Sequence, residues 1–259
     1  MEDVLSVNDQ ERLPESIRNR LHGCFENCIE RQFAQDTSLV NVGSTKGPFI
    51  ELLVYEDGTY DFAVSEVGFD NVFLTSKGDV GRPEGEDVVD GEITVEIAMR
   101  NCLDMPVCIH ELGGQASWTA LVDDMETGHQ YIVEEGIKGL VWSQDTQSIE
   151  YWNDELYTNA TQSIASAFLA GSWDLSRNNF IVRGNTEFIY IDHDPARRMD
   201  LSNFQSKKHI PQKLWEDTIP MIHEMAESVL GDDCDFSHVL DGREELVRAN
   251  CLDAVSYLS

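Results

Sequence analysis

The sequence predicts a two-lobed α+β fold, with a strand-rich amino-terminal half and a helix-rich carboxy-terminal half. Up to Gly136, short apolar runs are separated by turns that contain glycine, which is typical of strands. One helical stretch interrupts this first half. After Gly136 the apolar residues recur mainly at helical spacing, interrupted by two short β-like runs. We therefore expect a β-rich lobe with one internal helix, followed by an α-rich lobe with one hairpin.

The first part of the chain is expected to form a helix and then a meander of strands. Pro14 lies near the start of an apolar pattern with helical spacing. Asp57-Gly58 stands between two apolar runs, which is a strong hairpin signal. The predicted elements are a helix over 11–33 and strands over 49–55, 60–66 and 71–77.

A polar, acidic loop rich in glycine follows over residues 79–91. Pro106 is expected to end the next helix, because proline disrupts a helix interior. Thr127-Gly128 is expected to join the last two strands of this half. The predicted elements are a helix over 92–104 and strands over 107–111, 117–123 and 129–134.

The second half is expected to be mostly helical, with the turn Gly184-Asn185 joining two short strands. Pro220 is expected to kink or split the helix that contains it. The predicted elements are helices over 153–170, 211–230 and 243–257 and strands over 180–183 and 188–192. The predicted domains are a helical extension over 1–38, an amino-terminal lobe over 39–136 and a carboxy-terminal lobe over 137–259.

The net charge is the most unusual property of the composition. Eighteen Lys and Arg residues face 48 Asp and Glu residues, a formal charge of -30 spread along 259 residues. Molar salt would screen the resulting self-repulsion, so we interpret the acidity as adaptation to a high-salt cytoplasm. An unusually acidic protein from an ordinary environment is the alternative. Such a surface repels phosphates, and direct binding of nucleic acid is not expected.

Six scattered cysteines include no Cys-x-x-Cys pair, which argues against a zinc site. Cys24 and Cys28 are four residues apart and are expected to share one helix face as thiols. The sequence opens without a signal-peptide pattern and has no run of about 18 apolar residues. We expect a soluble, cytoplasmic protein that does not insert into membranes.

Three polar residues in the second half carry the strongest chemical signal. Asp174 and Asn179 are separated by four residues, and Asp192 ends the second strand of the following hairpin. A hairpin brings its two ends together, so Asn179 and Asp192 could share a Mg²⁺ ion while Asp174 stands beside them. A carboxylate near an attacking hydroxyl, with oxygen ligands for Mg²⁺, is the arrangement that phosphoryl transfer requires.

The stretch from Phe168 to Asp194 resembles the atypical kinases, namely the HipA-like kinases and, more distantly, the phosphatidylinositol 3- and 4-kinases. The resemblance implies a bilobal protein-kinase-like fold that uses ATP and Mg²⁺. It assigns the catalytic role to Asp174 and the metal-ligand roles to Asn179 and Asp192. Three positions depart from the family pattern. Leu175-Ser176 replaces the usual Arg-His, and Asp194 replaces a glycine.

The same resemblance implies a strand lysine that contacts the nucleotide phosphates and a helix glutamate that pairs with it. Lys77, at the end of an apolar run, fits the lysine, and Glu92 fits the glutamate, with Glu96 as the alternative. A competing alignment places the lysine strand over 60–64, where no lysine exists. That alignment would describe a degraded kinase.

Two further segments are candidates for contacting the nucleotide. Gly43-Ser44-Thr45 could offer main-chain N–H groups to the phosphates, although a plain glycine turn is equally consistent. The strand that contains Glu134 would lead into an interlobe hinge, and its main chain would bind the adenine. His193 is interpreted as a structural residue behind Asp192.

The leading hypothesis is an ATP- and Mg²⁺-dependent kinase that phosphorylates Ser or Thr hydroxyls on a protein, by analogy with HipA-like enzymes. Lipid and small-molecule hydroxyls remain alternatives for the acceptor. A second hypothesis is a pseudokinase, a binding module for nucleotide or protein, suggested by the altered Leu175, Ser176 and Asp194. A third is nucleotidyl transfer on the same fold.

Overall fold

The computed structural model describes two compact units that share one chain. They comprise residues 1–103 with 118–136, and residues 104–117 with 137–259. The described residues are 5–8, 13–27, 30–33, 51–54, 60–66, 95–124, 130–144, 149–191, 193, 196, 198–202, 204, 209–231, 234, 236, 239 and 243–258.

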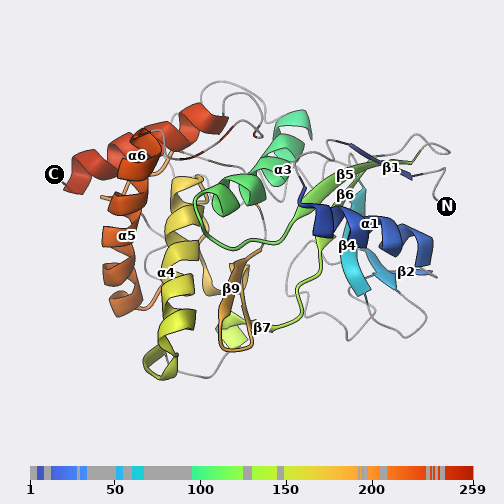
Figure 1. Cartoon of the computed structure of the whole chain (residues 1–259), viewed down its shortest axis with the longest axis horizontal. Helices are drawn as coiled ribbons and strands as arrows, with labels where there is room; N and C mark the ends of the chain where they lie inside the picture. Colours follow the sequence, from blue (N-terminus) through green and yellow to red (C-terminus); the bar gives the residue numbers. More distant parts are fainter. Residues whose placement is uncertain are drawn as a thin grey trace. The chain divides into compact units, whose positions relative to one another are not determined.

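The first unit contains a six-stranded antiparallel sheet with the strand order β1-β5-β6-β4-β3-β2. Figure 1 shows β4, β5 and β6 of this sheet together with helix α1. The strands are β1 Leu5–Asn8, β2 Glu30–Phe33, β3 Glu51–Val54, β4 Tyr60–Glu66, β5 Thr119–Asp124 and β6 Gln130–Glu135, and helix α1 spans Glu15–Asn27. The sheet therefore combines strands from the beginning and from the end of the unit's sequence.

Two of its hairpins follow from local sequence signals. Strands β3 and β4 pair with Val54 opposite Tyr60, and strands β5 and β6 pair with Asp123 opposite Gln130. The predicted hairpins are confirmed, although both turns lie outside the described residues. The predicted strand over 71–77 and the loop over 79–91 also lie outside them.

The predicted helix over 11–33 is wrong at its carboxy-terminal end. Helix α1 ends at Asn27, and Glu30–Phe33 forms strand β2 against β3. The helix begins at Glu15 rather than at residue 11, with Pro14 next to its start as expected. The carbonyl of Pro14 accepts bonds from the N–H groups of Ile17 and Arg18, both at 3.0 Å. Pairing with a distant strand overrides the helical spacing in the last part of the predicted helix.

Helix α3 spans Val95–Glu111 and contains Pro106, so two predictions are wrong: the helix does not end at Pro106, and 107–111 is not a strand. Proline removes one helical hydrogen bond, but packing can offset that loss. The residues around Pro106 supply this packing. Met105, Cys108 and Ile109 are buried in the core of the second unit.

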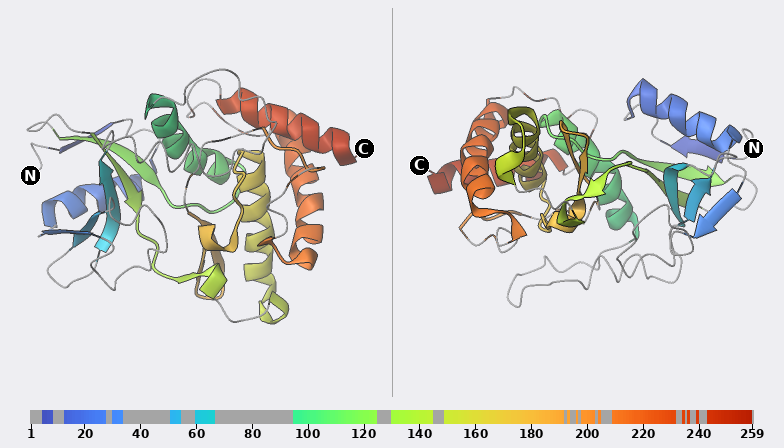
Figure 2. Two further views of the ribbon diagram at one scale, coloured as in Figure 1. Left: turned by 180° about the vertical axis from the view of Figure 1, so that it is seen from behind. Right: turned by 90° about the horizontal axis from the view of Figure 1, so that it is seen from below.

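The second unit is built around helix α4, Asp154–Leu169, which packs on α5, Gln212–Leu230, and on strand β9. Figure 2 shows α4 and α5 running side by side, with α6, Arg243–Leu258, packed against α5. Asn153 caps α4, because its Oδ1 accepts a bond of 2.8 Å from the Leu156 N–H. These helices match the predicted ranges, and α5 continues through Pro220 as one helix rather than two.

A three-stranded sheet in the order β7-β8-β9 completes this unit. The predicted hairpin is confirmed: β8, Phe180–Arg183, pairs with β9, Glu187–Tyr190, while the short β7, Leu140–Val141, was not predicted. The rings of Phe180 and Phe188 stack with centroids 4.7 Å apart, and both meet the Trp142 ring edge-on. This aromatic cluster anchors the hairpin in the core.

Candidate functional site

A tight turn at the end of α4 begins the candidate site. Gly171 has a φ of +93°, a left-handed conformation that favours glycine. Its N–H donates to the Phe168 carbonyl, and the Ser172 N–H donates to the Ala167 carbonyl, both at 2.9 Å. These two bonds close the helix and reverse the chain. The loop that carries Asp174 therefore leaves α4 in a defined direction.

The loop is held on both sides of Asp174. The buried Ser172 Oγ lies 2.6 Å from the Tyr190 hydroxyl on β9. On the other side, Leu175 is completely buried in the core. Asp174 itself is partly exposed between these two anchors. Its position is therefore set by the helix end, by strand β9 and by the core.

The structure brings Asp174 and Asn179 into contact. Asn179 Nδ2 donates a bond of 2.9 Å to the main-chain carbonyl of Asp174, and the Asn179 N–H donates to the Ser176 carbonyl at 3.0 Å. Asp174 Oδ1 accepts from the Ser176 N–H at 3.2 Å, as in an Asx turn. Because the carbonyl of Asp174 needs a donor, the orientation of the Asn179 amide is determined, and Oδ1 is the acceptor end of that amide.

The hairpin then places the other end of the ribbon beside Asn179. Phe180 pairs with Tyr190, and the Ile191 N–H donates to the Asn179 carbonyl at 2.8 Å. Asp192 follows directly in the chain but lies outside the described residues. The hairpin thus brings Ile191, the residue before Asp192, to the same end as Asn179. The position of the Asp192 carboxylate remains a prediction.

His193 is buried, in keeping with the structural role expected for it. Its Nε2 lies 3.0 Å from the Ser117 hydroxyl oxygen and 2.9 Å from the Ser117 carbonyl oxygen. The Ser117 N–H in turn donates to the Tyr190 carbonyl at 2.9 Å. Residues 115–117 therefore lie along β9, a contact that no sequence signal indicates.

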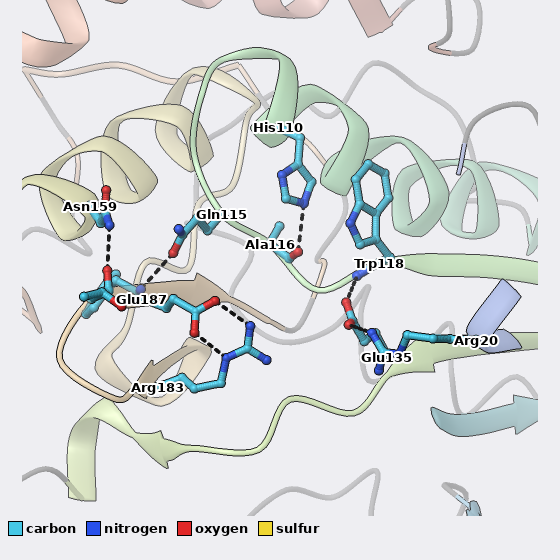
Figure 3. A network of polar contacts seen from close by, with 11 residues as sticks. Arg20, His110, Gln115, Ala116, Trp118, Glu135, Asn159, Arg183 and Glu187 are labelled. Atoms are coloured by element: carbon cyan, nitrogen blue, oxygen red, sulfur yellow. Dashed lines mark hydrogen bonds and ion pairs between the residues drawn. The ribbon is translucent and has the colours of Figure 1, made fainter. Parts of the chain in front are cut away.

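Figure 3 shows how side chains hold this crossing segment and the hairpin. The Gln115 Oε1 accepts from the Phe188 N–H at 2.9 Å, and His110 Nε2 lies 2.9 Å from the Ala116 carbonyl. At the hairpin turn, Asn159 Nδ2 donates to the Thr186 carbonyl at 2.6 Å. The framework around the candidate site is thus tied to both α3 and α4.

Arg177 is a cation between Asp174 and Asn179 that the sequence reasoning passed over. Its Nη2 donates to the Trp142 carbonyl at 3.1 Å, and its Cζ lies 5.0 Å from the centroid of the Trp142 ring. A basic residue in so acidic a chain was the signal that could have singled it out. In the structure this side chain fastens the loop to the segment after β7.

Most of the predicted nucleotide-binding residues lie outside the described part of the chain. They are Lys77, Glu92, Gly43, Ser44 and Thr45, and they stay predictions. Glu96 lies within α3. Glu134 lies in β6, where it is opposite both Ala63 of β4 and Thr119 of β5.

Strand β4 covers the segment in which the competing alignment places the strand lysine. It pairs with β6 over Phe62–Glu66, and it is the last described strand before α3. β5 occupies the other edge of β6. Neither β4 nor β5 contains a lysine. Both strands that pair with β6 therefore lack a lysine.

Helix α1 is attached to the end of β6 by an ion pair that was not predicted. Arg20 Nη1 lies 2.5 Å from Glu135 Oε1, and Glu135 Oε2 accepts from the Trp118 N–H at 3.3 Å (Figure 3). The Glu135 side chain is 9% exposed. This pair fixes α1 to the strand by which the chain leaves the first unit.

Among the described residues, no group of three or more His, Cys, Asp or Glu side chains could hold a metal ion. A Mg²⁺ ion does not require such a cage, since it usually takes one or two protein ligands together with substrate phosphates and water. The amide oxygen of Asn179 is a hard donor of the required type. Within the described part of the chain, no helix has both the length and the apolar character needed to cross a bilayer.

No protein-family model matches the sequence, and no curated protein matches it at a significant level. One similar solved structure is the Rio2 kinase from Chaetomium thermophilum in a complex described as ADP/Mg²⁺-phosphoaspartate. The two sequences are 12% identical, and the match covers 93% of this chain and 69% of that chain with a TM-score of 0.33. A likeness of this size carries no argument about family or activity.

Proposed function

We propose that the protein is an ATP- and Mg²⁺-dependent phosphotransferase of the HipA-like kinase type that phosphorylates Ser or Thr hydroxyls on a protein. The observation that carries the proposal is the hydrogen bond from Asn179 Nδ2 to the Asp174 carbonyl at 2.9 Å. It fixes the two loop residues relative to each other and directs the amide oxygen of Asn179 away from that bond. Phosphoryl transfer depends on such positioning more than on covalent chemistry.

In this proposal Asp174 accepts the proton of the attacking hydroxyl or orients that hydroxyl. The amide oxygen of Asn179 and the carboxylate of Asp192 would hold Mg²⁺. When bound, the metal neutralises the charge that develops on the transferring phosphoryl group. In the proposal, residues of the first lobe would hold the nucleotide. They are Lys77, Glu92, Gly43, Ser44, Thr45 and Glu134.

The proposed lobes are residues 39–136 and 137–259, with residues 1–38 as an extension. In the structure, residues 1–38 supply strands β1 and β2 to the sheet of the first unit, and residues 104–117 pack with the second unit. The packing of the second unit supports a rigid platform for chemistry, because Asp174 stands between the anchored Ser172 and Leu175. A catalytic group on such a platform loses little entropy when substrate binds. The proposal also places the protein in a high-salt cytoplasm, which is inferred from its net charge.

A second candidate function is a catalytically impaired nucleotide- or protein-binding module. Two observations favour it. The strands that flank β6 contain no lysine. Leu175, at the position of the usual arginine, is fully buried in the core and therefore cannot contact a substrate. Loss of the phosphate-binding lysine and of a polar catalytic-loop residue would reduce turnover more than binding.

One experiment separates the two. The purified protein is incubated with γ-labelled ATP and Mg²⁺ in molar KCl, with α-labelled ATP in parallel to detect nucleotidyl transfer, and nucleotide binding is measured by calorimetry. For the kinase, Asp174→Ala reduces phosphate transfer by about 10²–10⁴-fold. Binding without transfer of either label identifies the binding module.

Two adjacent asparagines provide a matched control for the metal ligand. Asn179 is buried, whereas Asn178 is exposed. Asn179→Ala and Asp192→Ala should abolish the Mg²⁺ dependence of nucleotide binding, while Asn178→Ala should leave it intact. If Asn178→Ala and Asn179→Ala behave alike in a protein with an unchanged circular dichroism spectrum, the proposed metal site is wrong.

A further inference from the structure

Asp174, Ser176 and Asn179 are joined in a closed ring of three hydrogen bonds. The Ser176 N–H donates to Asp174 Oδ1 at 3.2 Å, and the Asn179 N–H donates to the Ser176 carbonyl at 3.0 Å. Asn179 Nδ2 closes the ring by donating to the Asp174 carbonyl at 2.9 Å. Each of the three residues is therefore bonded to the other two, and such a network restricts the motion of every member.

The main chain around this ring is fixed to the rest of the second unit. Two residues before Asp174, Ser172 Oγ lies 2.6 Å from the Tyr190 hydroxyl, and both of these residues are completely buried. Tyr190 is held in β9, where its N–H donates to the Gln115 carbonyl at 2.9 Å. One residue after Asp174, Leu175 is completely buried in the core. The location of the Asp174 carboxylate therefore depends mainly on rotations within its own side chain.

The bond from the Ser176 N–H sets those rotations. It engages Oδ1 of the carboxylate from two residues further along the chain, as in an Asx turn. The donor residue is itself held in place, because the carbonyl of Ser176 accepts from the Asn179 N–H. Both oxygens of a carboxylate are acceptors, and none of the residues that the structure describes donates to Oδ2. Asp174 is partly exposed, so Oδ2 is the oxygen with acceptor capacity for a substrate hydroxyl.

We propose that the main-chain N–H of Ser176 is a positioning group, which holds Oδ1 of Asp174 so that Oδ2 faces the acceptor hydroxyl. This assignment rests on the proposed phosphotransferase function. In that reaction the acceptor oxygen bonds to the γ-phosphorus of ATP while the bond from that phosphorus to the β,γ-bridging oxygen breaks. The hydroxyl proton passes to Oδ2, and ADP leaves with the electron pair of the broken bond. The Ser176 N–H keeps its proton throughout.

The orientation of the carboxylate has a large effect on the rate of such a step. A base must lie within about 2.6–3.2 Å of the group whose proton it removes. A misplacement of about 1 Å can lower a rate about 10²-fold. A carboxylate that is already turned towards the substrate needs no further ordering when the substrate binds. The N–H of Ser176 would therefore contribute to the rate of transfer rather than to the affinity for ATP.

The proposal changes the interpretation of the sequence at position 176. Serine there replaces the histidine of the kinase pattern that this stretch resembles, and the replacement suggested an impaired enzyme. Every residue except proline has a main-chain N–H, so the replacement leaves the orienting bond in place. The Ser176 side chain makes no capping hydrogen bond to the turn that follows it. The N–H at this position therefore matters more for transfer than the identity of the side chain.

Replacement of Ser176 by proline removes this donor. The φ of Ser176 is -72°, and the proline ring fixes φ near about -65°. Ser176→Ala is the matched variant, because it removes the hydroxyl and keeps the N–H. Both full-length variants are incubated with saturating γ-labelled ATP and Mg²⁺ in molar KCl. Ser176→Pro should transfer phosphate at least about tenfold more slowly than Ser176→Ala, while calorimetry should give ATP affinities within about twofold of each other.

A second measurement needs no proline variant and no turnover. The exchange rate of the Ser176 amide hydrogen is measured by NMR in wild type, Asp174→Asn and Asp174→Ala. The side-chain oxygen of asparagine can still accept the bond from the Ser176 N–H, whereas alanine has no acceptor there. The Ser176 amide should therefore exchange about three- to tenfold faster in Asp174→Ala than in the other two proteins.

Equal rates of transfer by Ser176→Pro and Ser176→Ala would overturn this assignment and leave the phosphotransferase function standing. A loss of ATP binding in Ser176→Pro as large as its loss of transfer would also overturn it, because the bond would then only hold the loop together. If Ser176→Pro does not fold, the exchange rates decide, and equal exchange in all three proteins refutes the assignment. Absence of transfer by the wild-type protein is a different result, since it refutes the phosphotransferase function and this assignment with it.

Discussion

His193 and Ser117 are 76 residues apart in the sequence, yet the imidazole Nε2 of His193 lies 3.0 Å from the Ser117 hydroxyl. The same nitrogen lies 2.9 Å from the Ser117 carbonyl oxygen. This contact joins the residue that follows Asp192 to the segment that leads from α3 to β5. The backbone on one side of the candidate metal ligand is therefore held by the core, independently of any bound metal.

This contact predicts coupled stabilities. His193→Ala should lower the free energy of unfolding by about 1–3 kcal/mol, because it leaves buried polar groups of Ser117 without this partner. Ser117→Ala should lower the free energy of unfolding by a smaller amount. The double variant should be less destabilised than the sum of the two, with a coupling of about 0.5–3 kcal/mol, measured by urea unfolding in molar KCl. Additive effects would show that the two side chains act separately.

Two glycines are expected to respond to alanine in opposite directions. A Cβ at Gly114 would lie 2.7 Å from Ser166 Cβ and 2.9 Å from Ile109 Cγ2, both too close. Gly114→Ala should destabilise the protein by about 1–3 kcal/mol through overpacking. At Gly23, inside α1, a Cβ meets nothing within 4 Å, so Gly23→Ala should stabilise the helix by about 0.5–1 kcal/mol. Thermal unfolding measures both, and a shift of the same sign for both would contradict the packing described here.

Cys251 is expected to be unreactive while the protein is folded. Burial, together with nearby Cys234, raises the pKa of the Cys251 thiol to about 12 from its ordinary value of 9.0. The reactive thiolate is therefore scarce at pH 8. Iodoacetamide labelling followed by peptide mass spectrometry should show modification of Cys251 only after unfolding, with the partly exposed Cys234 as internal reference. Equal labelling rates in the folded protein would refute this.

The same shift has a consequence at high pH. The folded protein retains the Cys251 proton above pH 9, where the unfolded chain loses it. The folded state then binds more protons than the unfolded state, so stability should fall as the pH rises from about 9 towards 12. Cys251→Ala, compared with wild type in urea at each pH, should show a smaller decline over that range.

The pair between Arg198 and Asp253 should add a small, salt-sensitive stability. Hydrogen bonding to the Arg198 guanidinium lowers the pKa of the Asp253 carboxyl from its ordinary value of 3.8. A lowered pKa means that the contribution is present above about pH 3.8 and is lost as the pH falls through the lower folded value. Both side chains are well exposed, so solvent screens the pair.

Asp253→Asn should therefore lower the unfolding temperature slightly at neutral pH in low salt. The difference from wild type should disappear in molar KCl, and also once the pH falls below the lowered pKa of Asp253 in the folded protein. Asp200→Asn is the control, because Asp200 bonds only to Ser202 among the contacts described. A difference between Asp253→Asn and wild type that persists in molar KCl would mean that Asp253 acts through packing.

Elements with local signals were predictable from the sequence. Helix α4 follows its cap at Asn153 and ends at the turn of Gly171, and the hairpin β8–β9 follows apolar runs around Gly184. The spacing from Asp174 to Asn179 also came from the sequence, and the bond between them agrees with it. These features depend on residues close together in the chain, so their patterns were visible without the fold.

The sequence alone determined the acidic charge, the helical or strand-like spacing of the apolar residues, and the chemical identity of the candidate site. These are properties of residue type and spacing. The tertiary structure decided what depends on distant partners. It carried α3 through Pro106 by burying the residues around it, turned Glu30–Phe33 into a strand against β3, and placed Ser117 beside His193. Contacts across the chain leave no periodic signal in either segment, since each supplies only half of the interaction.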